Sequence, residues 1–263
     1  GGGVIAAKLL SVVCGTLAVF LVYLFGRRFG HTVAILAAAL VAFEPWSIYY
    51  GGLIMKEAAV SVVVLLFFVG ARRLFDSAQT ARSLGLGLGL LTVTAGLFQY
   101  ELLPILATAT TVTLWIHQRR LVWPYLVGTT AAGLVLLAIT WAGMGVPISA
   151  KLYFFTGRDF WDALPTATSP DPAGLASRFL PVKIALSGIM GWYPVLLVLA
   201  FLGSRDARVP RTESTLLAAF GLSYLYIHAV PGDLWPRFLI PATAVFATYA
   251  ALGIAAPQGW LMR

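Results

Sequence analysis

Long apolar runs, separated by short polar connections, most strongly limit what this chain can fold into. Many of them approach the ~20 residues that an α-helix needs to cross a bilayer. Hydrophobic residues make up 60% of the 263 residues and charged residues only 11%, whereas a soluble domain usually carries about 25% charged residues. Because backbone groups that face lipid must be paired within their own segment, the runs predict an all-α membrane helix bundle.

Hydropathy predicts about nine membrane-spanning segments, in a single domain over residues 1–263. A loop at about 144–180 is longer than an ordinary connection and is predicted to lie outside the membrane. The predicted segments are approximately Val4–Phe25, His31–Tyr49, Glu57–Phe75, Ser83–Phe98, Leu102–Ile116, Leu121–Gly143, Pro181–Gly203, Glu213–Ala229 and Pro236–Ala255.

The basic residues support this layout, because they divide between alternate connections. One set of connections carries 11 arginines, at positions 27, 28, 72, 73, 82, 119, 120, 205, 208, 211 and 263, whereas the other set carries six basic residues, mostly in the long loop. Short basic loops remain in the cytoplasm. We therefore expect an integral protein of a bacterial or archaeal plasma membrane, with the N-terminus of this chain outside and its C-terminus in the cytoplasm.

Three further features have structural interpretations. The net charge of +8 does not indicate a nucleic-acid partner, because the basic residues form short clusters between apolar runs. Cys14 lies alone in the first apolar run, so we expect it to pack in the core rather than form a disulfide. Gly85 and Gly89 lie in a predicted span that lacks the context of a phosphate loop. We expect these glycines to permit close packing of helices.

The stretch Glu44–Ala58, EPWSIYYGGLIMKEA, places polar groups between two apolar runs on the predicted external side. Lys56, Glu57 and Tyr50 converge there at one membrane face. Glu44 lies slightly deeper, and it should face the bundle or a wet cavity because a lone carboxylate in lipid costs about 2.5–3.5 kcal/mol. Two interpretations stay open. The cluster is a functional site, or it anchors the structure through a helix-dipole contact of Glu57 and interfacial tyrosines.

Other polar residues share this predicted face. Glu101, between the fourth and fifth segments, is either a substrate-binding residue or a solvated loop acid. Arg237 opens the last segment, where it could pair with a phosphate or extend to the lipid headgroups. His228 and Asp233, in the last external turn, are candidate ligands of a divalent metal. One His and one Asp alone do not make a metal signature.

Motifs of known catalytic machinery are missing from the sequence. It has no Ser-His-Asp spacing, HExxH, CxxC or Walker sequence. Composition and pattern alone therefore predict a polytopic membrane protein with an external polar site.

Two stretches are similar to a known group of enzymes. The region from Gly15 to Phe68 contains a span that ends in Arg-Arg-Phe-Gly, an alanine-rich span, a Pro-x-x-x-x-Tyr-x-Gly pattern and Lys56-Glu57. The late stretch WPRFLIPATAVFATYAALG contains the pattern Arg-aromatic-Leu-x-Pro, which starts at Arg237. Together they resemble polytopic glycosyltransferases of the GT-C superfamily, and most of all glycosyltransferase family 39. That family includes protein mannosyltransferases and aminoarabinose lipid A transferases.

The resemblance implies an inverting transfer of a sugar from a polyprenyl-phosphate donor to a lipid, glycan or protein acceptor on the external face. It places Lys56 and Arg237 on the donor phosphate, and Glu57 in a role that orders the site. In the family, the catalytic acid lies in the first external loop, which would precede this chain. The base is therefore unknown within residues 1–263 and is expected upstream of residue 1.

Two alternatives come from other functional classes. A transporter or lipid flippase would also have many spans and charges within the membrane, although such proteins often show internal repeats and charge near the midplane. A noncatalytic subunit of a membrane assembly is the third possibility. Replacement of Lys56, Glu57 and Arg237 by Ala would leave sugar transfer intact in that case.

Overall fold

The fold is helical throughout the part of the chain that the computed structural model describes, namely residues 2–45, 48, 57–76, 81–98, 102–144, 192–229 and 236–255. Nine α-helices and two short 3-10 helices lie in these ranges, with no strand among them. The prediction of an all-α fold is confirmed for these residues. The elements are α1 (Gly2–Gly26), η1 (Arg27–Phe29), α2 (His31–Ala42), α4 (Glu57–Asp76), α5 (Ala81–Phe98), α6 (Leu102–His117), η2 (Arg119–Leu121), α7 (Val122–Met144), α12 (Trp192–Ser204), α13 (Arg211–Ala229) and α14 (Pro236–Ala255).

Most helix ends lie within about two residues of the predicted segments. The second predicted segment is interrupted after Ala42, and Pro45 and Ile48 are helical again. The second segment was expected to run to Tyr49, but α2 ends at Ala42 and Phe43 caps it outside the helical region. Pro45 explains the early end, because proline disfavours helical geometry in the residue before it and donates no backbone hydrogen bond. Residues 181–191 of the seventh segment and residues 145–180 of the long loop lie outside the described ranges.

One described stretch has both the length and the hydropathy of a membrane span. It is Val4–Phe29, with 26 residues and a mean hydropathy of 2.3. Five shorter apolar helical stretches of 10–17 residues accompany it, at His31–Ala42, Gly85–Gly96, Leu102–His117, Tyr193–Ser204 and Leu239–Ala255.

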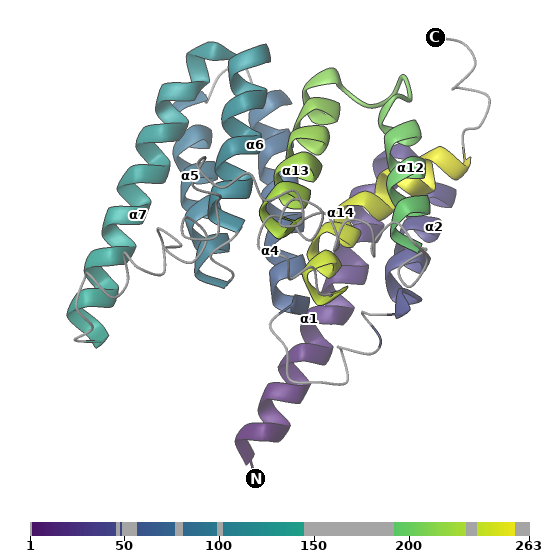
Figure 1. Cartoon of the computed structure of the whole chain (residues 1–263), viewed down its shortest axis with the longest axis horizontal. Coiled ribbons are helices and arrows are strands. Elements are labelled where there is room, and N and C mark those ends of the chain that lie inside the picture. Colours follow the sequence, from purple (N-terminus) through teal and green to yellow (C-terminus); the bar gives the residue numbers. More distant parts are fainter. Residues whose placement is uncertain are drawn as a thin grey trace, which may run out of the picture.

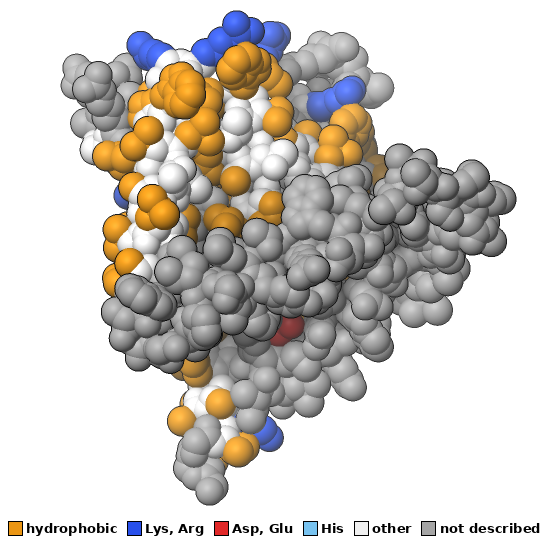
Figure 2. All heavy atoms as spheres, turned by 60° about the vertical axis from the view of Figure 1, so that its left-hand side comes forward, with side chains coloured by type: hydrophobic (Ala, Val, Ile, Leu, Met, Phe, Trp, Pro, Cys, Tyr) orange, Lys and Arg blue, Asp and Glu red, His pale blue; other side chains and the backbone are white. Residues whose placement is uncertain are grey.

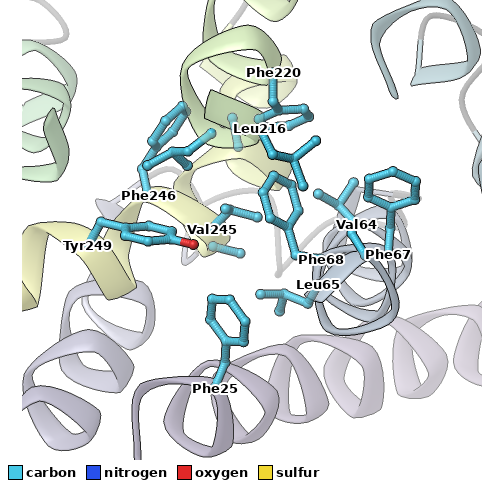
Figure 3. Packing of buried hydrophobic residues seen from close by; sticks show 14 of the residues in the cluster. Phe25, Val64, Leu65, Phe67, Phe68, Leu216, Phe220, Val245, Phe246 and Tyr249 are labelled. Atoms are coloured by element: carbon cyan, nitrogen blue, oxygen red, sulfur yellow. The ribbon is translucent and has the colours of Figure 1, made fainter. Parts of the chain in front are cut away.

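Aromatic side chains from four helices meet in the centre of the bundle (Figure 3). Phe68 of α4 and Phe220 of α13 lie edge to face, with ring centroids 5.3 Å apart. Phe246 of α14 lies 6.1 Å from Phe220. Phe25 of α1 contacts Tyr249 of α14 at 6.3 Å. The core therefore joins the first helices of the chain to the last two.

Glycines set the closest approaches between helices. A Cβ atom at Gly89 of α5 would lie 2.6 Å from the carbonyl carbon of Gly128 in α7, and one at Gly85 would lie 3.2 Å from Cβ of Pro124. The predicted packing role of these two glycines is confirmed. Gly203 of α12 lies against α14 in the same way, because a Cβ there would collide with the carbonyl oxygen of Tyr249.

Large apolar side chains cover much of the outer surface (Figure 2). On α1, Ile5 and Leu10 are 63% and 62% exposed, and on α7 Trp123 and Leu134 are 74% and 62% exposed. Soluble monomers rarely expose apolar patches of more than a few hundred Å². Cys14 is half-buried on α1 rather than in the core, so the expectation for this residue is wrong. The surface is typical of a protein that lipid covers.

Alternate connections gather at one end of the bundle, where Figure 2 shows basic side chains together at the top. This arginine end comprises η1, the end of α4, η2 and residues 205–211. Two hydrogen bonds join its parts. Arg208 Nη1 donates to the Phe29 carbonyl at 2.8 Å, and Gln118 Nε2 donates to the Phe75 carbonyl at 3.4 Å. The N-terminus lies at the opposite end (Figure 1).

Candidate functional site

A buried carboxyl group begins α4, away from the arginine end. Glu57 is the first residue of this helix and is only 4% exposed. The Ser61 hydroxyl donates to the Glu57 backbone carbonyl at 2.9 Å and not to its carboxyl group. Glu57 Oε2 is buried and has no hydrogen-bond partner among the described residues. Buried polar atoms are nearly always paired, so this oxygen calls for an explanation.

The Glu57 side chain lines a cavity of about 430 Å³. The cavity lies between four helices, and Gly15 of α1 borders open space, because a Cβ there would meet nothing within 4 Å. Small and apolar groups form most of its wall. Lining residues include Ser11, Gly15 and Thr16 of α1, Val41 of α2, Glu57 and Ser61 of α4, and Ile240 and Ala244 of α14. An oxygen on the wall of such a space can accept a hydrogen bond from a ligand hydroxyl.

Glu44 lies beside this region and is completely buried, as expected for a carboxyl group that should face the bundle. Its Oε1 accepts a hydrogen bond of 2.9 Å from the Tyr193 hydroxyl. This contact joins the chain after α2 to the start of α12. Tyr193 was not predicted as a partner, since 149 residues separate the two positions.

Two residues in the first half of α14, Ile240 and Ala244, line the cavity together with Glu57. The structure thus brings Glu57 and α14 to the same cavity, and the predicted convergence of Glu57 with Arg237 stays a prediction. The side chains of Arg237 and His228 lie outside what the structure describes, as do residues Lys56, Tyr50, Glu101 and Asp233.

The described residues alone do not supply a metal-ligand set. Within the described ranges, no group of three His, Cys, Asp or Glu side chains lies together. Among the described lining residues Glu57 alone carries a carboxyl group, and zinc sites in proteins usually take at least three protein ligands. A metal with His228 and Asp233 remains a prediction, and no chemical step is assigned to it.

A third buried glutamate, Glu213 at the arginine end, was not predicted from the sequence. Glu213 accepts two hydrogen bonds from Arg28, one of them 2.8 Å long from Nη1 to Oε2. The Tyr249 hydroxyl also donates to Oε1. The Arg28 guanidinium lies 4.0 and 4.2 Å from the ring centres of Phe25 and Phe29. A possible signal is that Glu213 directly follows an arginine-rich connection.

Asp206 holds the neighbouring turn at this end. It accepts hydrogen bonds of 2.9 Å from both the backbone NH and Nε of Arg208. The hydrogen bond to Asp206 is the main cause that raises the pKa of the Arg208 guanidinium. These carboxyl groups are therefore engaged by arginines, unlike Glu57 Oε2.

The chain was compared with family models, curated proteins and solved structures. No family model, curated protein or solved structure matches this chain. The similarity to family 39 glycosyltransferases therefore stands on the short sequence motifs, and it enters below as a hypothesis.

Proposed function

We propose that this chain is part of a polytopic membrane glycosyltransferase that moves a sugar from a polyprenyl-phosphate donor to a lipid, glycan or protein acceptor. The observation that carries the proposal is the buried Glu57 Oε2, which has no hydrogen-bond partner among the described residues, in a residue that lines a cavity of about 430 Å³. A protein does not ordinarily leave such an atom unpaired unless a ligand or water completes it. A role in building the glycans or glycolipids of a cell envelope would follow.

The membrane placement rests on two features. The outer faces of α1 and α7 carry exposed apolar side chains, and the short arginine connections lie together at one end. A helical bundle with about nine spans explains both features, since lipid would cover the outer faces. Because arginine-rich short loops remain in the cytoplasm, the arginine end faces the cytoplasm. The cavity of Glu57 then lies nearer the external face.

The proposed donor site combines the cavity with the two motifs of the resemblance. Lys56 directly precedes Glu57, and Arg237 lies one helical turn before Ile240 on the cavity wall. We assign Lys56 and Arg237 to the donor phosphate, since cations stabilise the charge that develops on a leaving phosphate. Glu57 is a positioning residue, whose free oxygen would accept a hydrogen bond from a sugar hydroxyl.

The reaction follows from the donor chemistry. A hydroxyl oxygen of the acceptor bonds to the anomeric carbon, the bond from that carbon to the phosphate oxygen breaks, and polyprenyl phosphate leaves with the bonding electrons. The hydroxyl proton passes to a carboxylate base. The resemblance expects that base in the first external loop of the family, and we assign it to no residue described here.

The first test is donor binding. The chain in nanodiscs should retain a labelled polyprenyl-phosphate sugar, and Glu57→Gln should weaken retention because a neutral amide replaces the carboxyl group. Thr248→Val is the matched control, because the Thr248 hydroxyl is also buried without a partner but does not line the cavity. This control should bind like the unchanged chain.

Transfer is measured with the chain expressed together with any coding sequence that precedes it. A donor-binding role predicts that Glu57→Gln raises the KM for the donor, in line with its weaker retention, and lowers kcat/KM by up to about a hundredfold. Equal retention of donor by Glu57→Gln, or none by the unchanged chain, would count against the donor site. Uptake of a labelled solute into proteoliposomes, without transfer, would favour the transporter.

A further inference from the structure

An arginine pair between two exposed tryptophans marks one corner of the arginine end. The corner lies where α6 ends, η2 follows and α7 begins, and it consists of Trp115, Arg119, Arg120 and Trp123. Arg119 Nε donates to the Trp115 carbonyl at 3.2 Å. The Arg119 guanidinium lies 5.2 Å from the Trp115 ring centre. These contacts hold one guanidinium in a defined place while both arginines stay exposed.

The positive charge of this corner is not neutralised by any described carboxyl group. The ion pairs that the structure gives at the arginine end join Arg28 to Glu213 and Arg208 to Asp206. Each of those carboxyl groups is buried beside its own arginine. Among the described side chains, none carrying a negative charge contacts Arg119 or Arg120. An anion from outside the chain would complete the corner.

The tryptophans place the corner at the depth of lipid headgroups. Trp115 and Trp123 are 57% and 74% exposed, and the neighbouring Ile116 is 59% exposed. Tryptophan concentrates at membrane–water interfaces, where an apolar ring meets a polar layer. Exposed apolar side chains continue down α7 through Val127 at 57% and Leu134 at 62%. The corner thus lies between the apolar surface of α7 and the cationic arginine end. An anionic phospholipid could place its acyl chains against the first surface and its headgroup against the second.

We propose that this corner binds the phosphodiester headgroup of an anionic glycerophospholipid from the leaflet at the arginine end. The planar guanidinium matches two phosphate oxygens at once, which favours arginine over lysine. A zwitterionic headgroup carries its own cation and would gain less from this charge. The inference rests on the proposed membrane placement, but not on the proposed sugar transfer.

The experiment counts retained lipid. The full chain is purified in neutral detergent, offered phosphatidylglycerol or phosphatidylcholine of identical acyl chains, and examined by native mass spectrometry and lipid-dependent thermal shift. Arg119→Gln/Arg120→Gln should reduce phosphatidylglycerol affinity by about tenfold, since each basic residue near an anionic headgroup contributes measurably. The matched control is Arg27→Gln/Arg73→Gln, which removes two exposed arginines from the same end without changing the corner.

We expect Arg119→Gln/Arg120→Gln to lose affinity for phosphatidylglycerol selectively, whereas the control variant keeps it. Arg119→Lys/Arg120→Lys should retain part of the affinity, because it keeps the charge and loses the planar contact. If both glutamine variants lost phosphatidylglycerol affinity equally, the binding would come from the total positive charge of the arginine end. That result would overturn the local site. Equal affinity for phosphatidylcholine, or equal protection by free inorganic phosphate, would also overturn it.

The corner variants also separate this inference from the proposed function. Donor retention at the Glu57 cavity should be unchanged in Arg119→Gln/Arg120→Gln, because the corner and the cavity involve different helices. Failure of lipid selectivity therefore leaves the glycosyltransferase proposal standing. Conversely, absence of donor binding would not affect lipid retention.

Discussion

Two buried glutamates at opposite regions of the molecule have nearly the same exposure and very different surroundings. Glu213, at the arginine end, is 3% exposed, and Glu57 is 4% exposed. Arg28 donates a hydrogen bond to Glu213 Oε2, and the Tyr249 hydroxyl donates to Oε1. Glu57 Oε2 has no hydrogen-bond partner among the described residues, and Glu57 lines a cavity. Burial alone therefore does not distinguish these two carboxyl groups, whereas their hydrogen-bond partners do.

The comparison also extends to the packing around each glutamate. Near the arginine end, α12 and α14 approach so closely that Gly203 has no room for a Cβ atom. Beside the cavity, Gly15 borders open space. One region is thus closely packed around a paired carboxyl group, and the other keeps open space beside Glu57. We expect the first to contribute stability and the second to contribute binding.

The largest expected effect is the loss of the Arg28–Glu213 pair. Arg28→Met keeps the alkyl stem but leaves the Glu213 carboxyl group buried without its cation, so we expect a loss of about 3–5 kcal/mol in the free energy of unfolding. The measurement is SDS-induced loss of helical circular dichroism in mixed micelles. Arg28→Met/Glu213→Leu should recover most of the loss, because it removes the uncompensated charge as well. An unchanged midpoint for Arg28→Met would contradict the structural role.

The sequence predicted the helices better than their contacts. Hydropathy located most helix ends, because each apolar run is a local property, and the spacing of arginines predicted one basic end. The early end of α2 could have been predicted from Pro45. The Arg28–Glu213 pair spans 185 residues and the Tyr193–Glu44 bond spans 149. Such contacts depend on which helices pack together, which hydropathy does not specify.

The candidate site was predicted only in part, because sequence patterns report local properties and not contacts between distant helices. Glu57 was singled out because a charge interrupts an apolar region, and this is a local signal. Residues from four helices line its cavity. Two small lining residues, Gly15 and Ala244, come from opposite ends of the chain. No local pattern marks that space, since small residues occur throughout this sequence. The free oxygen of Glu57 likewise became visible only once its neighbours were placed.

A smaller effect is expected from adding one methyl group in each region. Gly203→Ala should cost about 1–3 kcal/mol in the free energy of unfolding, because overpacking forces α12 away from α14. Gly15→Ala should cost nothing, and it should gain up to about 0.5–1 kcal/mol, since alanine has less freedom to lose in a helix. The same SDS titration measures both variants. Equal losses would show that the cavity region is packed as tightly as the arginine end.

The smallest change in stability should come from Glu57→Gln, and this makes it the sharpest comparison with Glu213→Gln. Both substitutions remove one negative charge and keep nearly the same shape. Glu213→Gln breaks the pairing with Arg28 and should cost about 3–5 kcal/mol, whereas Glu57→Gln should change the free energy of unfolding by less than about 1 kcal/mol. The SDS midpoints of the two variants measure this difference directly. If Glu57→Gln unfolds as early as Glu213→Gln, then Glu57 has a structural partner after all, and donor binding lost in that variant would only report misfolding. A stable Glu57→Gln chain with weak donor retention would instead assign the carboxyl group to the ligand, because nothing else about the protein would have changed.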